Sequence, residues 1–188
     1  MPRSMGFGDF AAVLAAAKVG ADWAWRELYA GVAGQLIGYA TAKGVVDAED
    51  VGADVMERVA ENIGGFHGDE PAFRSWVFTI AHHRIVDQLR RQRPTAPIES
   101  VAGVLTGRED PEATVLADLG AVRALALLDE LPPDHRDVVL LRVIAGFDVG
   151  EVAGILGRRP GTVRVQQHRA FRRLRGHVAQ STRSDVTR

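Results

Sequence analysis

The C-terminal part of the chain concentrates positive charge in one short segment. Arginine recurs throughout the stretch RRPGTVRVQQHRAFRRLR, residues 158–175, although the formal net charge of the 188-residue chain is only −1. A guanidinium group is planar and can give two parallel hydrogen bonds to a phosphate or to the acceptor edge of guanine. These residue types point to nucleic-acid binding, and their spacing decides whether the charges share one surface.

A helix that begins at Pro160 would divide this segment into two faces. Val163, Ala170 and Leu174 fall on the side that helical periodicity predicts to be buried. A basic helix end that merely interacts with its own macrodipole is the alternative interpretation. We favour DNA binding, because a tight turn precedes the helix. The predicted DNA contacts of this region are Arg159, Thr162, Arg164, Val165, His168, Arg169 and Arg172.

The residues before this helix predict how it is positioned. Asp148 is an N-cap candidate, and Glu151 follows it at the spacing of a capping box. Gly157 supplies a turn, and Pro160 suits the first turn of a new helix. Two short helices on a glycine turn, the second of them basic, describe a helix-turn-helix whose second helix can enter a major groove.

A second basic segment, FRSWVFTIAHHRIVDQLRR, interleaves aromatic and cationic residues. Proteins that bind single-stranded nucleic acid use rings to stack on bases and cations along the backbone. Helical spacing predicts that Phe73 and Val77 are core residues, whereas Trp76 fits a core role and a base-stacking role equally well. The candidate residues for contact with single-stranded nucleic acid here are Trp76, His82, His83, Arg84, Arg90 and Arg91.

The remaining polar residues carry less information. The acidic stretch DAEDVGADVMERVAENI, residues 47–63, is by itself typical of a solvated helix face. His82 and His83 are adjacent, so a helix would point them in different directions, and we expect no metal site. The chain has no cysteine, and no catalytic triad or glycine-rich phosphate loop stands out. We expect no catalytic residue and no cofactor.

Helical periodicity extends over nearly the whole chain, and no strand alternation accompanies it. The sequence predicts an all-α protein of two small helical domains joined by a flexible linker, the first with four helices and the second with a helix-turn-helix. The domains are residues 7–94 and 119–178, with a Pro- and Gly-rich linker at 95–118 and a tail at 179–188. No signal peptide or membrane span is recognisable, so we expect a cytoplasmic protein.

Five motifs in order resemble one family. They are DAEDVGADVMERV, FRSWVFTIAHHRIVDQLRR, DPEA, LPPDHRDVVLLRVIAGFDVGEVAGILG and GTVRVQQHRAFRRLR. Their order and spacing resemble the extracytoplasmic-function (ECF) sigma factors of the sigma-70 family, over about residues 10–178. The resemblance implies an alternative sigma factor that directs bacterial RNA polymerase core to specific promoters and helps to open the DNA.

The resemblance also implies roles for particular positions. The first domain would be of the sigma-2 type and recognise and melt the minus-ten element, and the second, of the sigma-4 type, would read the minus-thirty-five element. His83 stands where the family often has Asn in a loop that holds an extruded base. An exposed apolar stripe expected on the third helix suggests an anti-sigma factor as a further partner. The positions implied for docking on polymerase are Asp50, Val51, Asp54, Met56 and Glu57.

Two other interpretations remain open from the residues. A dimeric helix-turn-helix transcriptional regulator that binds a palindrome would account for residues 148–175. It would leave the tryptophan-bearing basic helix and the acidic helix without a role. A metal-dependent hydrolase that uses His82 or His83 is a more distant alternative.

Overall fold

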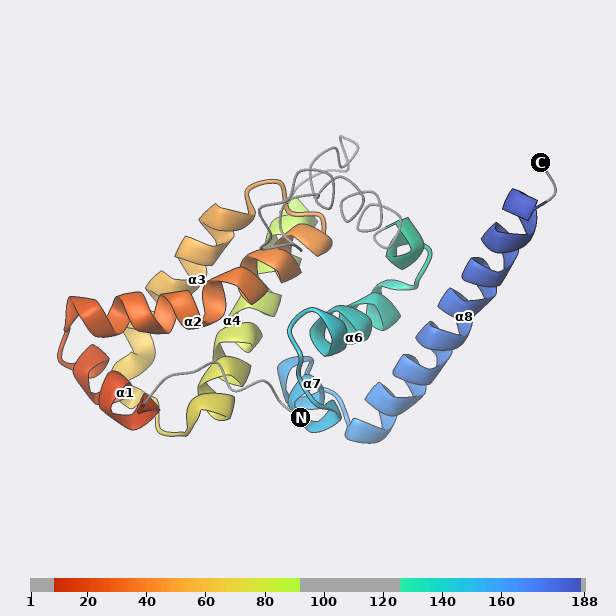
Figure 1. Ribbon diagram of the computed structural model, residues 1–188. Coiled ribbons are helices and arrows are strands. Elements are labelled where there is room, and N and C mark those ends of the chain that lie inside the picture. Colours follow the sequence, from red (N-terminus) through yellow and green to blue (C-terminus); the bar gives the residue numbers. More distant parts are fainter. Residues whose placement is uncertain (1–8, 92–125, 187–188) are drawn as a thin grey trace.

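The structure is a computed structural model that describes residues 9–91 and 126–186. These residues form helices and no strand, as the sequence predicts. Figure 1 shows α1 to α4 grouped on one side and α6 to α8 on the other. The helices are α1 (Phe10–Lys18), α2 (Asp22–Ala42), α3 (Ala48–Asn62), the 3-10 turn η1 (Ile63–Gly65), α4 (Glu70–Arg91), α6 (Pro133–Val143), α7 (Val149–Ile155) and α8 (Pro160–Val186).

The N-terminal unit, α1 to α4, is built around the apolar faces of its helices. Leu28 and Leu36 of α2, Val55 of α3, and Phe73 and Phe78 of α4 are fully buried. Burial of such side chains stabilises a fold by about 1.5–3 kcal/mol each. Because α2, α3 and α4 contribute to the same core, the positions of their polar faces are fixed relative to one another.

The C-terminal unit, α6 to α8, contains the predicted helix-turn-helix. The backbone N–H of Glu151 donates to the Asp148 carboxylate over 2.8 Å, and the Asp148 N–H donates to the Glu151 carboxylate over 2.6 Å. This confirms the capping box. Gly157 has a φ of 62°, a conformation that costs glycine little, and it turns the chain from α7 into α8.

Some local expectations differ from the structure, and others concern residues outside the described ranges. The sequence offers Asp22 as a candidate N-cap for α2, but the N-cap is Ala21, which has no side-chain oxygen, and Asp22 is the first helical residue. Helix α8 continues to Val186 instead of ending at Val178, because residues 179–186 include no glycine or proline to stop it. The predicted linker, 95–118, lies outside the described residues, as do residues 119–125 at the start of the predicted second domain; residues 126–129 are helical.

The two units share one hydrophobic cluster. It runs from Val13 and Leu28 in the N-terminal unit to Phe147 and Val163 in the C-terminal unit. The Phe78 ring on α4 meets the Phe147 ring before α7 edge-on, with centroids 4.9 Å apart. The two units therefore pack directly against each other.

Candidate nucleic-acid interface

Helix α8 presents the predicted DNA-reading face to solvent. Val163 and Ala170 are fully buried, and they anchor the opposite side of the helix against α6 and α7. The exposed side carries every DNA contact that we predicted for this region, including Val165, of which 49% is exposed. All seven predicted contacts are exposed: Arg159, Thr162, Arg164, Val165, His168, Arg169 and Arg172.

A cleft of about 410 Å³ lies beside this face, between the end of α6, the start of α7 and one side of α8. Arg164 and His168 form one wall, and Arg142 and Arg175 add two further cations to the lining. The Arg142 Nη1 donates to the Phe147 carbonyl, which holds the side chain in place. Sequence periodicity did not single out Arg142, because its place in the cleft depends on the packing of α6 against α8.

The aromatic residues of the N-terminal unit form a cluster around Trp76. The Trp76 ring stacks on Phe66, with centroids 5.0 Å apart and planes inclined by 16°, and it meets the edge of Phe73. Phe73 and Val77 are fully buried, which confirms their core role. Trp76 is half-buried, so one face of its ring is already occupied within the protein.

The other candidate residues on α4 differ in their surroundings. His83, Arg90 and Arg91 are exposed, whereas Arg84 forms an ion pair with Asp54 on α3. His83 lies inside α4, as helical spacing predicts, and not in a loop of the kind that the resemblance implies for an extruded base. The loop ahead of α4 instead contains Phe66 and ends at Asp69, whose carboxylate accepts a hydrogen bond from the Ala72 N–H.

His82 is partly buried against α2, where its Nδ1 lies 3.0 Å from the Tyr39 hydroxyl. Burial lowers the pKa of His82, and the neighbouring cations Lys43 and Arg158 act in the same direction while Asp137 opposes them. Burial also raises the pKa of Tyr39 well above its usual value of 10.0, with a smaller contribution from Asp137. Both shifts favour a neutral His82 ring that accepts a hydrogen bond from the protonated Tyr39 hydroxyl.

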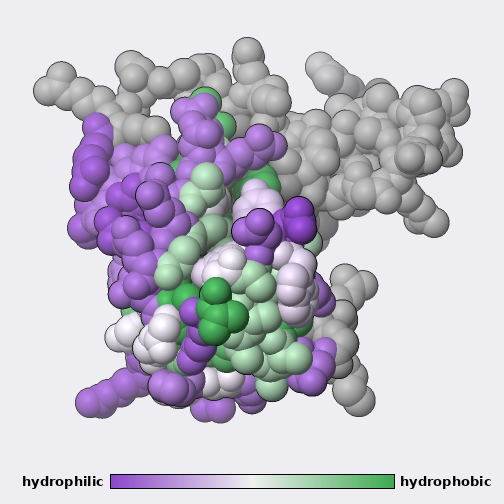
Figure 2. Space-filling view, turned by 90° about the vertical axis from the view of Figure 1, so that its left-hand side faces the viewer, coloured by the Kyte–Doolittle hydropathy of each residue, from purple (hydrophilic) through white to green (hydrophobic). Residues whose placement is uncertain are grey.

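The residues predicted to dock on polymerase lie on two sides of α3. Asp50 and Glu57 are exposed and Asp54 is partly exposed. Val51 and Met56 are buried in the core, 3% and 9% exposed, because the apolar stripe of α3 faces α2 and α4. The exposed apolar stripe that we expected on α3 is therefore absent. Figure 2 shows the end of the molecule near α1 and the start of α2, where apolar residues gather beside a hydrophilic surface.

The described part of the chain shows no sign of a membrane span or of a metal site. Over residues 9–91 and 126–186, no helix is long and apolar enough to cross a membrane. In the same ranges, no three His, Asp or Glu side chains lie together in a way that could hold a metal ion.

The exposed arginine face on a capped helix-turn-helix defines a DNA-binding protein with a second helical unit. Two family descriptions match the chain: Sigma-70 region 2 over residues 25–95, and Sigma-70, region 4 over residues 121–174. The ECF RNA polymerase sigma factor ShbA of Streptomyces griseus is 33% identical over 70% of this chain and 72% of its own length. SigM of Mycobacterium tuberculosis, also an ECF sigma factor, is 32% identical over 91% of this chain and 88% of its own length.

Solved structures have the same fold. The structure of CnrH in complex with the cytosolic domain of CnrY has a TM-score of 0.70 at 24% identity and covers 92% of this chain and 99% of that one. The sigma factor RpoE from Bartonella quintana, in complex with the anti-sigma factor NepR, has a TM-score of 0.57 at 19% identity, over 90% and 94% of the two chains.

The chain belongs to the ECF RNA polymerase sigma factors. It is an alternative sigma factor, of the family whose members are initiation subunits that direct core polymerase to specific promoters and help to open the DNA. The match of region 2 to residues 25–95 also accounts for the N-terminal unit, which the dimeric-regulator interpretation leaves without a role.

Proposed function

We propose that the two helical units divide promoter recognition between them. The unit within residues 7–94 recognises and melts the minus-ten element, residues 119–178 read the minus-thirty-five element, and residues 95–118 connect them. The observation that carries this proposal is the exposed cationic face of α8, fixed by the buried Val163 and Ala170 behind it.

The face of α8 has the chemistry to read a duplex. Arg164 lies in the second turn of the helix, and in helix-turn-helix proteins the first turns of the second helix reach the base edges. Arg169 and Arg172, further along, suit phosphate contacts. Val165 offers an apolar surface that fits a thymine methyl group.

The minus-ten role falls on the exposed side of α4. His83, Arg90 and Arg91 are open to solvent and can contact the backbone of a separated strand. Trp76 would contribute the free face of its ring, while Phe66 supports the other face. Arg84 and His82 act only after they leave their present partners, Asp54 and Tyr39.

Docking on polymerase falls on the acidic side of α3. Asp50 and Glu57 are exposed there, and Asp54 is shared with Arg84. Val51 and Met56 would support this side from the core without contacting a partner. Since surface charges chiefly set association rates and specificity, removal of these carboxylates should slow the assembly of the holoenzyme.

The remaining assignments follow from the same role. Polymerase performs the chemistry, so the chain itself carries no catalytic residue and requires no cofactor, and it works in the cytoplasm. An anti-sigma factor is a further partner, because both solved structures described above are complexes, and one of them is a complex of a sigma factor with an anti-sigma factor.

The test is transcription in vitro with purified core polymerase on a pool of genomic fragments, with and without the protein, and with every RNA start mapped. We expect starts that depend on the protein and share two upstream elements. Arg164→Ala should reduce the amount of RNA from starts that depend on the upstream element. Arg26→Ala, at an exposed arginine on α2, should leave that amount unchanged. Binding of the free protein as a dimer to palindromic DNA, without protein-dependent starts, would overturn the proposal.

A further inference from the structure

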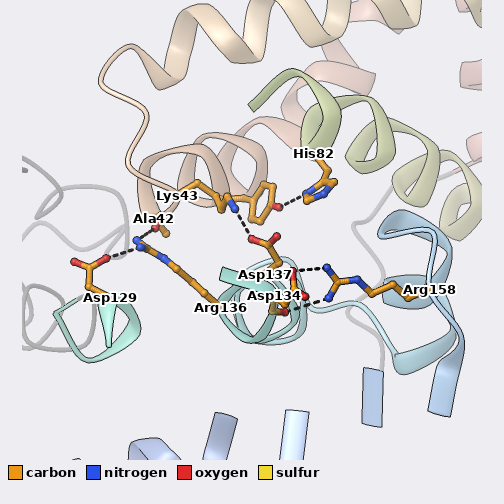
Figure 3. Close-up of polar contacts among 9 residues, drawn as sticks. Ala42, Lys43, His82, Asp129, Asp134, Arg136, Asp137 and Arg158 are labelled. Atoms are coloured by element: carbon orange, nitrogen blue, oxygen red, sulfur yellow. Dashed lines mark hydrogen bonds and ion pairs between the residues drawn. The ribbon is translucent and has the colours of Figure 1, made fainter. Parts of the chain in front are cut away.

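Arg158 belongs to the basic segment, yet its side chain is bound within the protein. It lies in the turn between α7 and α8, where its backbone N–H donates to the Ala153 carbonyl over 2.8 Å. The side chain is partly buried, and its Nη2 donates to the Asp134 carboxylate of α6 over 2.8 Å. Figure 3 shows the guanidinium facing Asp134. Arg158 therefore joins the start of α8 to α6 and is not a free cation.

The same guanidinium also fixes one side chain of α8. The Arg158 Nη1 donates to the Gln166 amide oxygen over 2.9 Å. A guanidinium group has donors only, so the atom of the Gln166 amide that faces it must be the oxygen. The NH2 group of Gln166 is left free, because it has no hydrogen-bond partner among residues 9–91 and 126–186. We call Arg158, Asp134 and Gln166 the Arg158 cluster.

Gln166 lies at the edge of the DNA-binding face of α8. It is partly buried, and its neighbours one turn away are the buried Val163 and Ala170 and the exposed Arg169. A helix with its side chains is about 10–12 Å wide and the major groove is about 12 Å wide, so the edges of a helix in the groove meet the phosphate backbones. A phosphate oxygen accepts hydrogen bonds and repels an amide oxygen. The free NH2 group of Gln166 has the chemistry that a phosphate requires.

We propose that Gln166 is a phosphate contact of the minus-thirty-five element and that Arg158 is the residue that positions it. Arg158 holds the Gln166 oxygen within the protein, so that the NH2 donors face the DNA, and it does not touch the DNA itself. The contact adds a neutral donor to the cationic contacts of α8. This inference rests on the proposed function, because it assigns a further contact and its positioning residue to the same surface.

The first experiment tests the Arg158 cluster in the free full-length chain, without polymerase or DNA. The side-chain NH2 signals of Gln166 are assigned in a proton–nitrogen NMR spectrum by their loss in Gln166→Ala. We expect both signals to shift in Arg158→Ala and to stay in place in Arg159→Ala, at the exposed neighbouring arginine. Exposed ion pairs add little stability, so Arg158→Ala should remain folded, which circular dichroism checks. Unchanged Gln166 signals in Arg158→Ala would overturn the positioning role.

The second experiment measures the affinity of the holoenzyme for a duplex that carries the minus-thirty-five element. Arg158→Ala and Gln166→Ala should each weaken binding by about three- to tenfold, the effect of one hydrogen bond. The double variant should bind no more weakly than Gln166→Ala, because Arg158 acts through Gln166. Losses that multiply in the double variant would show that Arg158 acts by another route, and they would contradict the proposal.

The salt dependence of the same affinities distinguishes a neutral donor from a cationic contact. Gln166 is uncharged and Arg158 is paired with Asp134, so neither variant should change the slope of log affinity against log salt concentration. Arg172→Ala, at an exposed cation of the same helix, should lower the magnitude of this slope by about 1. Phosphate contacts carry no direct sequence information, so the loss in Gln166→Ala should be equal on duplexes with each base pair changed in turn. A loss confined to one base pair would contradict the phosphate contact.

The two experiments separate this inference from the proposed function. If the parent holoenzyme does not bind the duplex, the proposed function fails and the phosphate contact fails with it, while the NMR measurement still decides whether Arg158 fixes Gln166. If the parent holoenzyme binds and Gln166→Ala binds equally tightly, the proposed function stands and the phosphate contact is overturned.

Discussion

Helices α4 and α8 are both long, arginine-bearing and amphipathic, yet they hold their positive charges differently. On α8 the side chains of Arg164, Arg169 and Arg172 are exposed. On α4, Arg74 is buried under the C-terminal unit and Arg84 is paired with Asp54. The same residue type thus serves as an available DNA contact on one helix and as an internal contact on the other, because only α4 lies between other helices.

The largest effect is expected where the two units meet. Phe147→Ala removes a fully buried ring that packs on Phe78 and under Arg74. The loss of a buried phenylalanine typically costs about 3–5 kcal/mol, so urea denaturation should show a decrease of this size in the free energy of unfolding. Val143→Ala, at a position 62% exposed on α6, is the control and should change it by less than about 0.5 kcal/mol.

A smaller effect is expected on the exposed face of α8. Arg164→Ala should weaken binding of the minus-thirty-five element by about 1–3 kcal/mol, and it should relax the preference for the base that Arg164 contacts. Affinity of the holoenzyme for duplexes with each base changed in turn measures both. An equal loss on every duplex would mean that Arg164 contacts phosphate only.

The capping box at the start of α7 should contribute a still smaller amount to stability. Asp148→Ala removes the side chain that accepts from the Glu151 N–H, and such a loss costs about 1 kcal/mol. Glu151→Gln keeps the capping-box chemistry and should be nearly neutral. Thermal denaturation of the two variants distinguishes the cap from the charge: if both lose equal stability, the charge of Glu151 is responsible.

The smallest effect is a pH dependence at His82 on α4. Because burial lowers its pKa from 6.5, the packed state prefers the neutral ring, and protonation favours the separated state. The stabilisation is complete above about pH 6.5 and is lost as the pH falls through the lowered pKa. The groups around His82 are Tyr39, Lys43, Asp137, His83 and Arg158.

The chain has no cysteine, so Glu61→Cys on α3 and Arg173→Cys on α8, both exposed positions, can carry two dyes. Energy transfer between these dyes, measured from pH 8 to pH 5, is the test of this dependence. The transfer should fall in the parent protein and fall less in His82→Gln. His83 is the next residue and is exposed, so His83→Gln should show the same pH profile as the parent protein. If His83→Gln flattens the profile and His82→Gln does not, the titrating group has been misidentified.

Local patterns predicted the helices and the α8 face well, because both depend on neighbours within a few residues. The capping box of Asp148 and Glu151 is an example. The role of Trp76 could not be decided from its sequence neighbours, because the ring that stacks on it, Phe66, comes from the preceding loop. Asp22 looked like a cap, yet the helix begins one residue earlier than that role requires.

Sequence patterns could not predict the contacts of Lys43 and Arg74 with the C-terminal unit, for a physical reason. Lys43 and Asp137 are 94 residues apart, and nothing near either residue indicates a partner. Buried charges are rare, so periodicity assigns such residues to solvent. Arg74 is the clearest case: it lies in the second basic segment, yet its observed hydrogen-bond partners are Gln35 and Ala145.

The buried charges of Lys43, Arg74 and Asp137 also make the contact between the units sensitive to heat in an unusual direction. Hydration of charged groups becomes less favourable as temperature rises, so the cost of removing these side chains from water decreases. Below the melting temperature, warming should therefore draw the units together and cooling should release them. Apolar contact also weakens on cooling, so the buried charges and the buried rings both predict energy transfer that rises with temperature, and a flat or falling series would contradict both. The contact between α4 and the C-terminal unit would then be sensitive to cold.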